Sequence, residues 1–317
     1  MNNLWKQMGV KYPIIQGAMA WVADPDLASA VSNAGGLGVV GTGNDPVEVV
    51  REKVETMKAK TDKPFAINVM LLNPHVEEVV DYLCQSGIST VTTGAGSPGR
   101  FMKQFREANI KVIPVVASVA LARRMEKEGV DAVVVEGTES GGHVGKTTTM
   151  ALLPQVVDAV NIPVIAAGGI GDGRGMAAAL MLGACGIQVG TRFVCAKESN
   201  AHPNFKEKII KAKDIDTVTT GEATGHPVRV LRNRLTKEYL RVERIEAGKE
   251  NPDWERLEAL GRGALRQAVV EGDTQNSSLM AGQIAGLINK EESCQEILQS
   301  YMDVCQATIR EKASEWL

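Results

Sequence analysis

One stretch of the chain concentrates residues able to do chemistry: residues 135–147 read VEGTESGGHVGKT. Its ending matches part of the phosphate-binding P-loop pattern G-x-x-x-x-G-K-[ST], although Ser140 stands where that pattern requires its first glycine. A different chemistry is also open, because the imidazole of His143 can act as an acid, a base or an oxyanion donor near neutral pH. Taken alone, these residues are compatible with either a phosphate loop or a catalytic histidine.

The surrounding sequence favours the histidine. A P-loop is followed by a helix, but residues 147–149 do not read as the start of a strong one. A P-loop also needs a second element that holds Mg²⁺, and the sequence offers no suitable strand ending in aspartate. Gly141, Gly142 and Gly145 flank His143, so its side chain has little packing of its own and can project over an active site. We therefore predict His143 as a catalytic residue, with a loop histidine bonded to backbone as the alternative.

Eight short, apolar segments recur along the first two thirds of the chain. They are apolar at consecutive positions, as expected of strands buried on both faces, and a helix-like stretch separates each pair. Eight strand–helix units predict an α/β fold, a (β/α)8 TIM barrel, with a doubly wound open sheet as its rival. The segments are residues 12–19, 37–43, 64–71, 89–96, 111–118, 132–137, 163–170 and 186–193.

Polar residues followed by proline mark three predicted helix starts. Asp24, Asp45 and Asn73 each precede a proline, the order expected of a capping residue and the first helical turn. Residues 36–41 (GLGVVG) match the dinucleotide-binding fingerprint, but they follow a helical stretch and run into a strand, the reverse of that motif. We therefore predict no Rossmann-type nucleotide site there.

After residue 200 the strand rhythm changes. Residues 204–212 predict a helix, residues 217–233 an irregular or hairpin-like segment, and residues 235–272 charged helices. A longer amphipathic helix is predicted over residues 291–316 and should pack back on the barrel. The expected plan is a barrel of residues 1–200 and 277–317, which binds the cofactor, with a smaller helical lid domain of residues 201–276 that covers the substrate.

The C-terminal ends of the predicted strands are small or polar, and in barrels of this type that face carries the active site. The endings after the seventh and eighth strands offer backbone N–H groups and a threonine hydroxyl, which predicts a phosphate site. At the other endings glycine backbone can approach a flat ring, Asn68 can bond to its carbonyl and amide edges, and Glu136 can accept from ribityl hydroxyls or a ring N–H. Together they predict a flavin mononucleotide (FMN) site made of Gly17, Ala18, Met19, Gly41, Thr42, Asn68, Glu136, Gly141, Gly142, Ala167, Gly168, Gly169, Gly190 and Thr191.

Composition and charge argue against several kinds of partner. With a formal net charge of −3 and scattered Lys and Arg, the chain has no electrostatic footprint for nucleic acid. No apolar run approaches the roughly 20 residues needed to cross a bilayer, and the first residues lack a signal-peptide core, so a soluble cytoplasmic protein is expected. The five cysteines form no C-x-x-C pair and include an odd one, so we expect buried thiols without a metal site or disulfide.

Several long segments together resemble one enzyme family. They are PIIQGAMAWVADPDLASAVSNAGGLGVVGTGN, PFAINVML, VVVEGTESGGHVG, PVIAAGGIGDGRG, QVGTRF and NSSLMAGQIAG (residues 276–286). In this order they are similar to the FMN-dependent enoyl-acyl-carrier-protein reductase II family, within the wider group that includes nitronate monooxygenases (2-nitropropane dioxygenases). The likeness covers essentially the whole chain.

That resemblance implies a flavin barrel in which NADH or NADPH reduces FMN, and the reduced flavin passes hydride to the β-carbon of a 2-enoyl thioester. The substrate would be carried by acyl carrier protein, in the last step of the fatty-acid elongation cycle. His143 matches the family's catalytic histidine, and a homodimer and a monovalent cation are implied by the resemblance alone.

Two other activities compete with that reduction. Nitronate oxidation would use the same flavin and histidine, but the short ESGGHVG loop and the GTGN ending look more like the reductase. A flavin-free isomerase or lyase would use His143 as a base on a phosphate-bearing substrate. A non-catalytic binding protein would leave His143 without a role.

Overall fold

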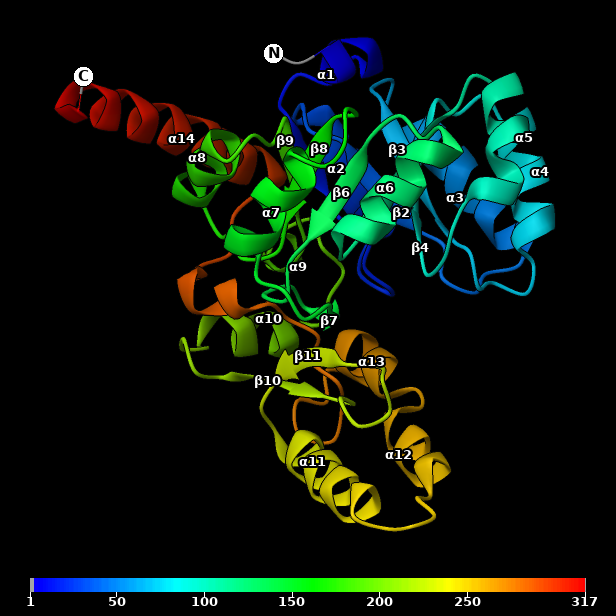
Figure 1. The fold of residues 1–317 in the computed structure, drawn as a ribbon, viewed down its shortest axis with the longest axis vertical. Helices are drawn as coiled ribbons and strands as arrows, with labels where there is room; N and C mark the ends of the chain where they lie inside the picture. The colour runs from blue at the N-terminus through cyan, green and yellow to red at the C-terminus, as the bar shows by residue number, and fades with distance from the viewer. Residues whose placement is uncertain (1–2, 317) are drawn as a thin grey trace.

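The chain folds as a parallel barrel with a second, smaller sheet beside it (Figure 1). The structure is a computed structural model, and it describes residues 3–316. Eight parallel strands follow the order β1-β9-β8-β6-β5-β4-β3-β2, and a bridge between Ile15 and Leu37 brings β1 back against β2. The predicted barrel is therefore confirmed and the open sheet is not. The strands are β1 (Ile14–Gln16), β2 (Gly38–Gly41), β3 (Phe65–Met70), β4 (Thr90–Gly94), β5 (Lys111–Val116), β6 (Val133–Glu136), β8 (Val164–Ala167) and β9 (Gly186–Val189).

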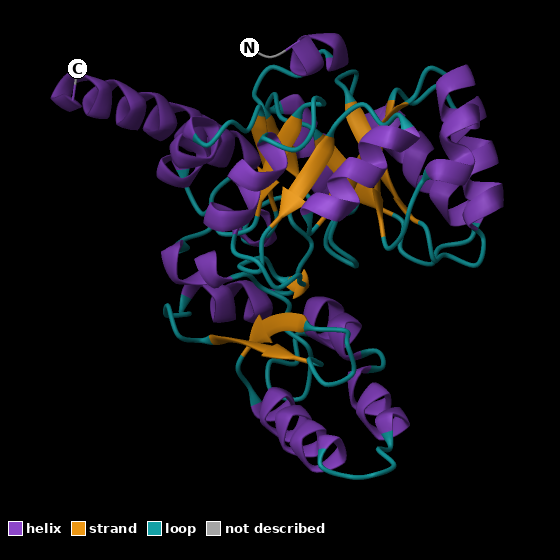
Figure 2. Cartoon of the chain, in the orientation of Figure 1, coloured by secondary structure: helices purple, strands orange, loops and turns teal. Residues whose placement is uncertain are grey.

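Helices cover the outside of the barrel (Figure 2). The long C-terminal helix packs back on it as expected: an added Cβ at Gly173 would lie 2.5 Å from the carbonyl oxygen of Tyr301. Within residues 3–316, no helix is both long and apolar enough to cross a membrane. The helices around the barrel are α1 (Asn3–Met8), α2 (Pro25–Asn33), α3 (Val47–Lys60), α4 (Val76–Gln85), η1 (Gly99–Phe101), α5 (Met102–Glu107), α6 (Val119–Glu128), α7 (Thr149–Val157), α8 (Gly173–Met181), α9 (Thr191–Val194) and α14 (Cys294–Trp316).

Side chains from the strands divide the core in two. One cluster packs under the helices, and a second, which includes Val39, Ile113 and Ile165, fills the barrel interior. Trp5 of α1 belongs to the interior cluster; it is fully buried, and its indole N–H donates to the carbonyl of Cys185 at 2.7 Å. The helix that precedes the first strand thus packs against the filled interior.

Only one of the three predicted capping residues caps a helix. Asp24 accepts from the Leu27 N–H at 3.0 Å at the start of α2. Asp45 instead pairs with Lys53 at 2.6 Å, and Asn73 accepts from the N–H of the residue just before α4. In α3 and α4 the proline precedes the helix instead of beginning it, so the polar side chain before it lies too early to reach the first helical N–H groups.

The expected helical lid is built around a small sheet. Its hairpin pairs antiparallel with β7 (Gly142–His143), which places His143 opposite Val228. One strand of this sheet thus comes from the barrel part of the chain, and the domain boundaries at residues 200 and 277 stay a prediction. We call residues 201–276 the insert. Its elements are α10 (Pro203–Ile210), β10 (Thr217–Thr220), β11 (Val228–Leu231), α11 (Arg234–Ala247), α12 (Trp254–Gly261), α13 (Ala264–Arg266) and the π-helical turn η2 (Gln267–Glu271).

Gly38 shows what the fingerprint-like glycines do. It lies in β2, where an added Cβ would stand 1.9 Å from the carbonyl oxygen of Ala28 in α2. We expect Gly38→Ala to destabilise the fold by about 3 kcal/mol, because neither the strand nor the helix can move aside freely. Chemical denaturation measures the effect, with Gly94→Ala as control because the space around Gly94 is open. Equal denaturation midpoints for both variants would contradict the close packing of α2 on β2.

Candidate active site

A cavity of about 380 Å³ opens at the C-terminal ends of the barrel strands. Apolar side chains from the barrel and from the insert, including Val115 and Phe205, form much of its wall. The few polar side chains among them suit a site that fixes the orientation of a small molecule. Of the residues predicted from the sequence, the wall contains Gly17, Ala18, Met19, Glu136, Gly141, Gly142, His143, Ala167, Gly168, Gly169, Gly190 and Thr191.

Three predicted cofactor residues, Gly41, Thr42 and Asn68, lie outside this wall. The Thr42 hydroxyl donates to the carbonyl of Asn68 at 2.7 Å, and the Asn68 amide donates to the Thr92 hydroxyl at 2.9 Å. These polar groups therefore connect β2, β3 and β4 to one another. A role in cofactor binding for them remains a prediction.

Glycines leave the backbone open along one side of the cavity. At Gly190, where φ is an ordinary −110°, an added Cβ would lie 3.6 Å from the sulfur of Met19 across the space. Gly168 and Gly169 have φ values of +84° and +72°, a left-handed backbone that favours glycine. A side chain at any of these positions would enter the cavity or strain the turn.

Residues 276–286 close another side of the cavity, although the site prediction did not include them. The Gly282 N–H donates to the Thr191 hydroxyl, and the Gln283 N–H donates to the carbonyl of Glu139, both at 2.9 Å. An added Cβ at Gly141 would lie 2.6 Å from the carbonyl carbon of Ala281. The signal in the sequence is the small pair Ala-Gly in NSSLMAGQIAG, which permits this backbone contact.

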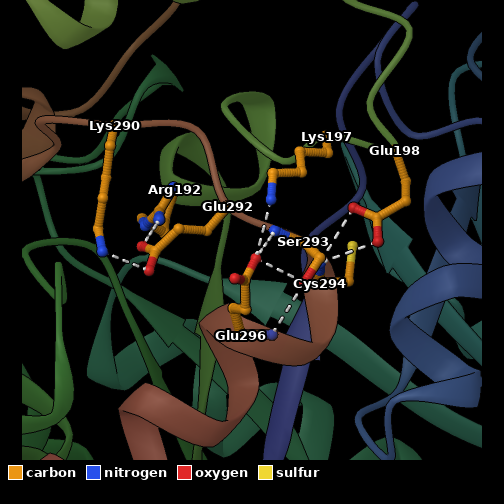
Figure 3. A network of polar contacts seen from close by, with 8 residues as sticks. All are labelled: Arg192, Lys197, Glu198, Lys290, Glu292, Ser293, Cys294 and Glu296. Atoms are coloured by element: carbon orange, nitrogen blue, oxygen red, sulfur yellow. Dashed lines mark hydrogen bonds and ion pairs between the residues drawn. The ribbon is translucent and has the colours of Figure 1, made fainter.

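A polar network ties the end of β9 to the C-terminal helix (Figure 3). Arg192, next to Thr191, is buried and pairs with Glu292, which also pairs with Lys290 at 2.8 Å. Glu198 accepts from the N–H of Cys294, the first residue of α14, at 3.0 Å. The network therefore fixes the segment that carries the Thr191 hydroxyl.

Glu139 is a cavity carboxylate that the strand endings did not predict. Its oxygens accept from the N–H of Thr149, the first residue of α7, at 2.9 and 3.0 Å. A carboxylate is favoured at a helix N-terminus, where it occupies the unpaired donors. The helix that follows Gly-Lys-Thr is thus bound by the protein's own carboxylate, which is the physical reason that this stretch is not a P-loop.

His143 lies on β7 at the cavity, with an exposed side chain. Although the side chain reaches solvent, the surrounding protein removes part of its water, and this desolvation, followed by the charge of His226 in the neighbouring hairpin, lowers the pKa of His143 below its usual value of 6.5. The neutral imidazole therefore predominates at neutral pH, and it still has one N–H to donate. Of the residues that sequence reasoning proposed for chemistry, His143 and Glu136 are brought to the same cavity.

Comparison with known proteins identifies the family. The family model described as Nitronate monooxygenase matches residues 1–86 and 76–303. The chain belongs to the nitronate monooxygenase family. The structure of FabK from Thermotoga maritima is similar at 44% identity and a TM-score of 0.94, over 100% of this chain and 99% of that one.

Two curated relatives with lower identity to this chain have different names. A probable nitronate monooxygenase from Staphylococcus saprophyticus is 33% identical, over 89% of this chain and 91% of the relative. The (3aS,4S,5R,7aS)-5-hydroxy-7a-methyl-1-oxo-octahydro-1H-indene-4-carboxyl-CoA dehydrogenase of Mycobacterium tuberculosis is 32% identical, over 94% of each chain. The nitronate monooxygenase family thus accommodates different substrates on one scaffold.

Proteins of the nitronate monooxygenase family are FMN-dependent flavin oxidoreductases. The cavity of this member fits such a cofactor. Because Gly190 has no Cβ, its backbone borders open space in the cavity that a side chain would otherwise fill. The turn at Gly168 and Gly169 borders the same space. A flat ring with a phosphate tail needs this kind of close backbone approach.

Glu136 is a carboxyl group of the cavity whose pKa is strongly raised. Burial raises its pKa to about 7, and the nearby Ser140 hydroxyl opposes the shift. Near neutral pH the Glu136 side chain is therefore a mixture of the protonated carboxylic acid and the ionised carboxylate. In this nitronate monooxygenase family member the cavity holds a carboxyl able to donate or accept a hydrogen bond.

The pKa of Glu136 predicts a pH-dependent stability. The folded chain keeps the proton up to about pH 7, whereas an unfolded chain loses it near 4.5, so ionisation weakens the fold as pH rises through that window. We expect Glu136→Gln to stabilise the apoprotein above pH 7 by on the order of 3 kcal/mol and to have little effect near pH 4.5. Melting temperatures of both proteins across this range measure it. Parallel curves would contradict a raised pKa of Glu136 in the folded protein.

Proposed function

We propose that the protein reduces the 2,3-double bond of enoyl thioesters carried by acyl carrier protein, using FMN and NADH or NADPH, in the last step of fatty-acid elongation. The observation that carries this proposal is the similarity to FabK, an enoyl-acyl-carrier-protein reductase II, at 44% identity over the full length of both chains. That similarity includes the insert and the strand that bears His143. The carboxyl-CoA dehydrogenase relative further supports a thioester substrate.

The residues of the cavity can be given roles in this reaction. Backbone at Gly168, Gly169 and Gly190 would hold the phosphate of FMN, and backbone at residues 17–19 would border its ring. Bound FMN supplies the hydride chemistry, with the nicotinamide nucleotide as the source of electrons. The apolar wall at Val115 and Phe205 excludes water from the acyl group.

His143 would act on the substrate directly. Reduction of an enoyl thioester adds a proton at the α-carbon and places negative charge on the thioester oxygen. A neutral imidazole N–H in the cavity can donate to that oxygen or supply that proton. The lowered pKa of His143 keeps it in this form at neutral pH.

Oxidation of alkyl nitronates is the second candidate, and the Staphylococcus saprophyticus relative favours it. Steady-state assays separate the two. We expect rapid NAD(P)H consumption with a crotonyl thioester and little oxygen uptake with a nitroalkane. Oxygen uptake with the nitroalkane and no thioester-dependent NAD(P)H oxidation would reverse the assignment.

Further properties stand as proposals on the same basis. We propose a cytoplasmic homodimer that uses acyl carrier protein as its partner and responds to a monovalent cation. Sedimentation analysis tests the homodimer, and activity in potassium versus lithium salts tests the response to a cation.

A further inference from the structure

A groove of about 700 Å³ on the insert is positively charged, unlike the chain as a whole. Five cations line it beside one carboxylate, Glu238, which pairs with Arg241 at 2.6 Å. The whole chain has a formal net charge of −3, so this groove is a local excess of positive charge. Its cations are Lys208, Arg232, Arg234, Lys237 and Arg241.

Two of these cations, both on α11, face solvent without an ion-pair partner among the described residues. Arg234 and Lys237 are exposed, and neither forms an ion pair within the part of the chain that the structure describes. They lie three residues apart on α11, and Lys237 lies four residues before Arg241, spacings at which like charges destabilise a helix. Because no ion pair among the described residues neutralises Arg234 or Lys237, an anionic surface from outside is the natural counterpart.

Two paths along the chain connect the groove to the cavity. On α10, Phe205 lines the cavity and Lys208, one turn later on a similar face, lines the groove. On β11, Val228 lies opposite His143, and Arg232 follows four residues later, roughly 13 Å away at the rise of a strand. Figure 1 shows α10 and β11 between the barrel and α11. The groove thus lies within reach of a flexible, thioester-bearing arm that enters the cavity.

We propose that this groove docks an acidic surface of the carrier protein that delivers the thioester. The inference rests on the proposed function and adds the place at which the partner binds. Exposed charges at the rim of an interface act mainly on the rate of encounter and are screened by salt. The groove should therefore affect carrier-linked substrates and leave carrier-free ones unchanged.

The test compares crotonyl-acyl carrier protein with the neutral N-acetylcysteamine thioester of crotonate. In the holoenzyme, Arg234→Glu combined with Lys237→Glu should raise KM for the carrier-linked substrate about tenfold or more. KM and kcat for the neutral thioester should not change. Both substitutions place acid in the first turns of α11, where the helix dipole favours it, so the variant should fold. The matched control is Arg244→Glu with Arg262→Glu, exposed insert cations outside the groove with the same change in charge.

The outcomes separate the docking site from the reaction. Equal KM values for wild type and groove variant, with both thioesters reduced, overturn the docking site and leave the proposed function standing. If wild type reduces neither thioester, both fall. A raised KM for the nucleotide instead would assign the groove to another ligand, and a changed oligomeric state in sedimentation would assign it to a second copy; either result also overturns the inference.

Salt dependence tests the inference without variants. The wild-type KM for the carrier-linked substrate should rise with salt, while the KM for the neutral thioester stays constant.

Discussion

Replacing His143 with alanine should leave FMN bound and lower enoyl thioester turnover by roughly 10²–10⁴-fold, the usual contribution of a general acid or base. The side chain is exposed at the cavity, so its loss creates no hole in the core. Flavin absorbance after gel filtration measures cofactor retention, and NAD(P)H oxidation with a crotonyl thioester measures turnover. Unchanged turnover in a yellow variant would remove His143 from the mechanism.

His226→Ala is the matched control for this substitution. His226 is also an exposed histidine, in the hairpin that pairs with the His143 strand, but it does not line the cavity. Turnover should be largely retained. Because the charge of His226 lowers the pKa of His143, its removal should raise that pKa. Since the neutral imidazole is the active form, the acid limb of the pH–rate profile should then move to higher pH. A shift to lower pH would contradict the coupling of the two histidines.

Gly190→Val should abolish stable FMN binding while the chain stays folded. The backbone of Gly190 suits any residue, but its Cβ points across the cavity toward the sulfur of Met19. Two further methyl groups would occupy the space proposed for the cofactor, and a filled pocket cannot open without moving packed atoms. The measurement is the flavin-to-protein ratio of the purified variant, together with its melting temperature after FMN is added.

The control is Gly94→Val, at the end of β4. Gly94 is also a strand-end glycine, but its surroundings are open and it is outside the cavity. That variant should keep its flavin. A fully yellow Gly190→Val would show that FMN binds elsewhere or in another orientation.

Much of the barrel can be predicted from the sequence, because a parallel sheet buried on both faces leaves a strong local signal. Each run of apolar residues, such as 132–137 and 163–170, contains a barrel strand. The predicted cavity residues were found for a related reason. Strand ends in a barrel converge on one face, so the fold alone brings Gly17, Glu136 and Gly190 together.

The remainder depends on contacts that periodicity and motif spacing do not reveal. Glu139 gives no local sign that it will bind the start of α7, and Gly282 reaches Thr191 from 91 residues away. His202 illustrates the same limit: it is half-buried as the N-cap of α10, where its Nδ1 accepts from the N–H of Asn204 at 3.1 Å. Proline position misled the prediction at Asp45 and Asn73, because an offset of one or two residues decides whether a side chain reaches the first N–H groups of a helix.

The strand that carries His143 is only two residues long, and its sheet partner in the described chain is β11 of the insert. Such a short strand has no stability of its own. Any opening of the hairpin that leaves the barrel folded should therefore release His143 first. In hydrogen exchange, amides of β11 should exchange before those of β8 and β9. On heating, activity should disappear below the temperature at which the flavin is released, so that a fully coloured sample is no guarantee of an active one.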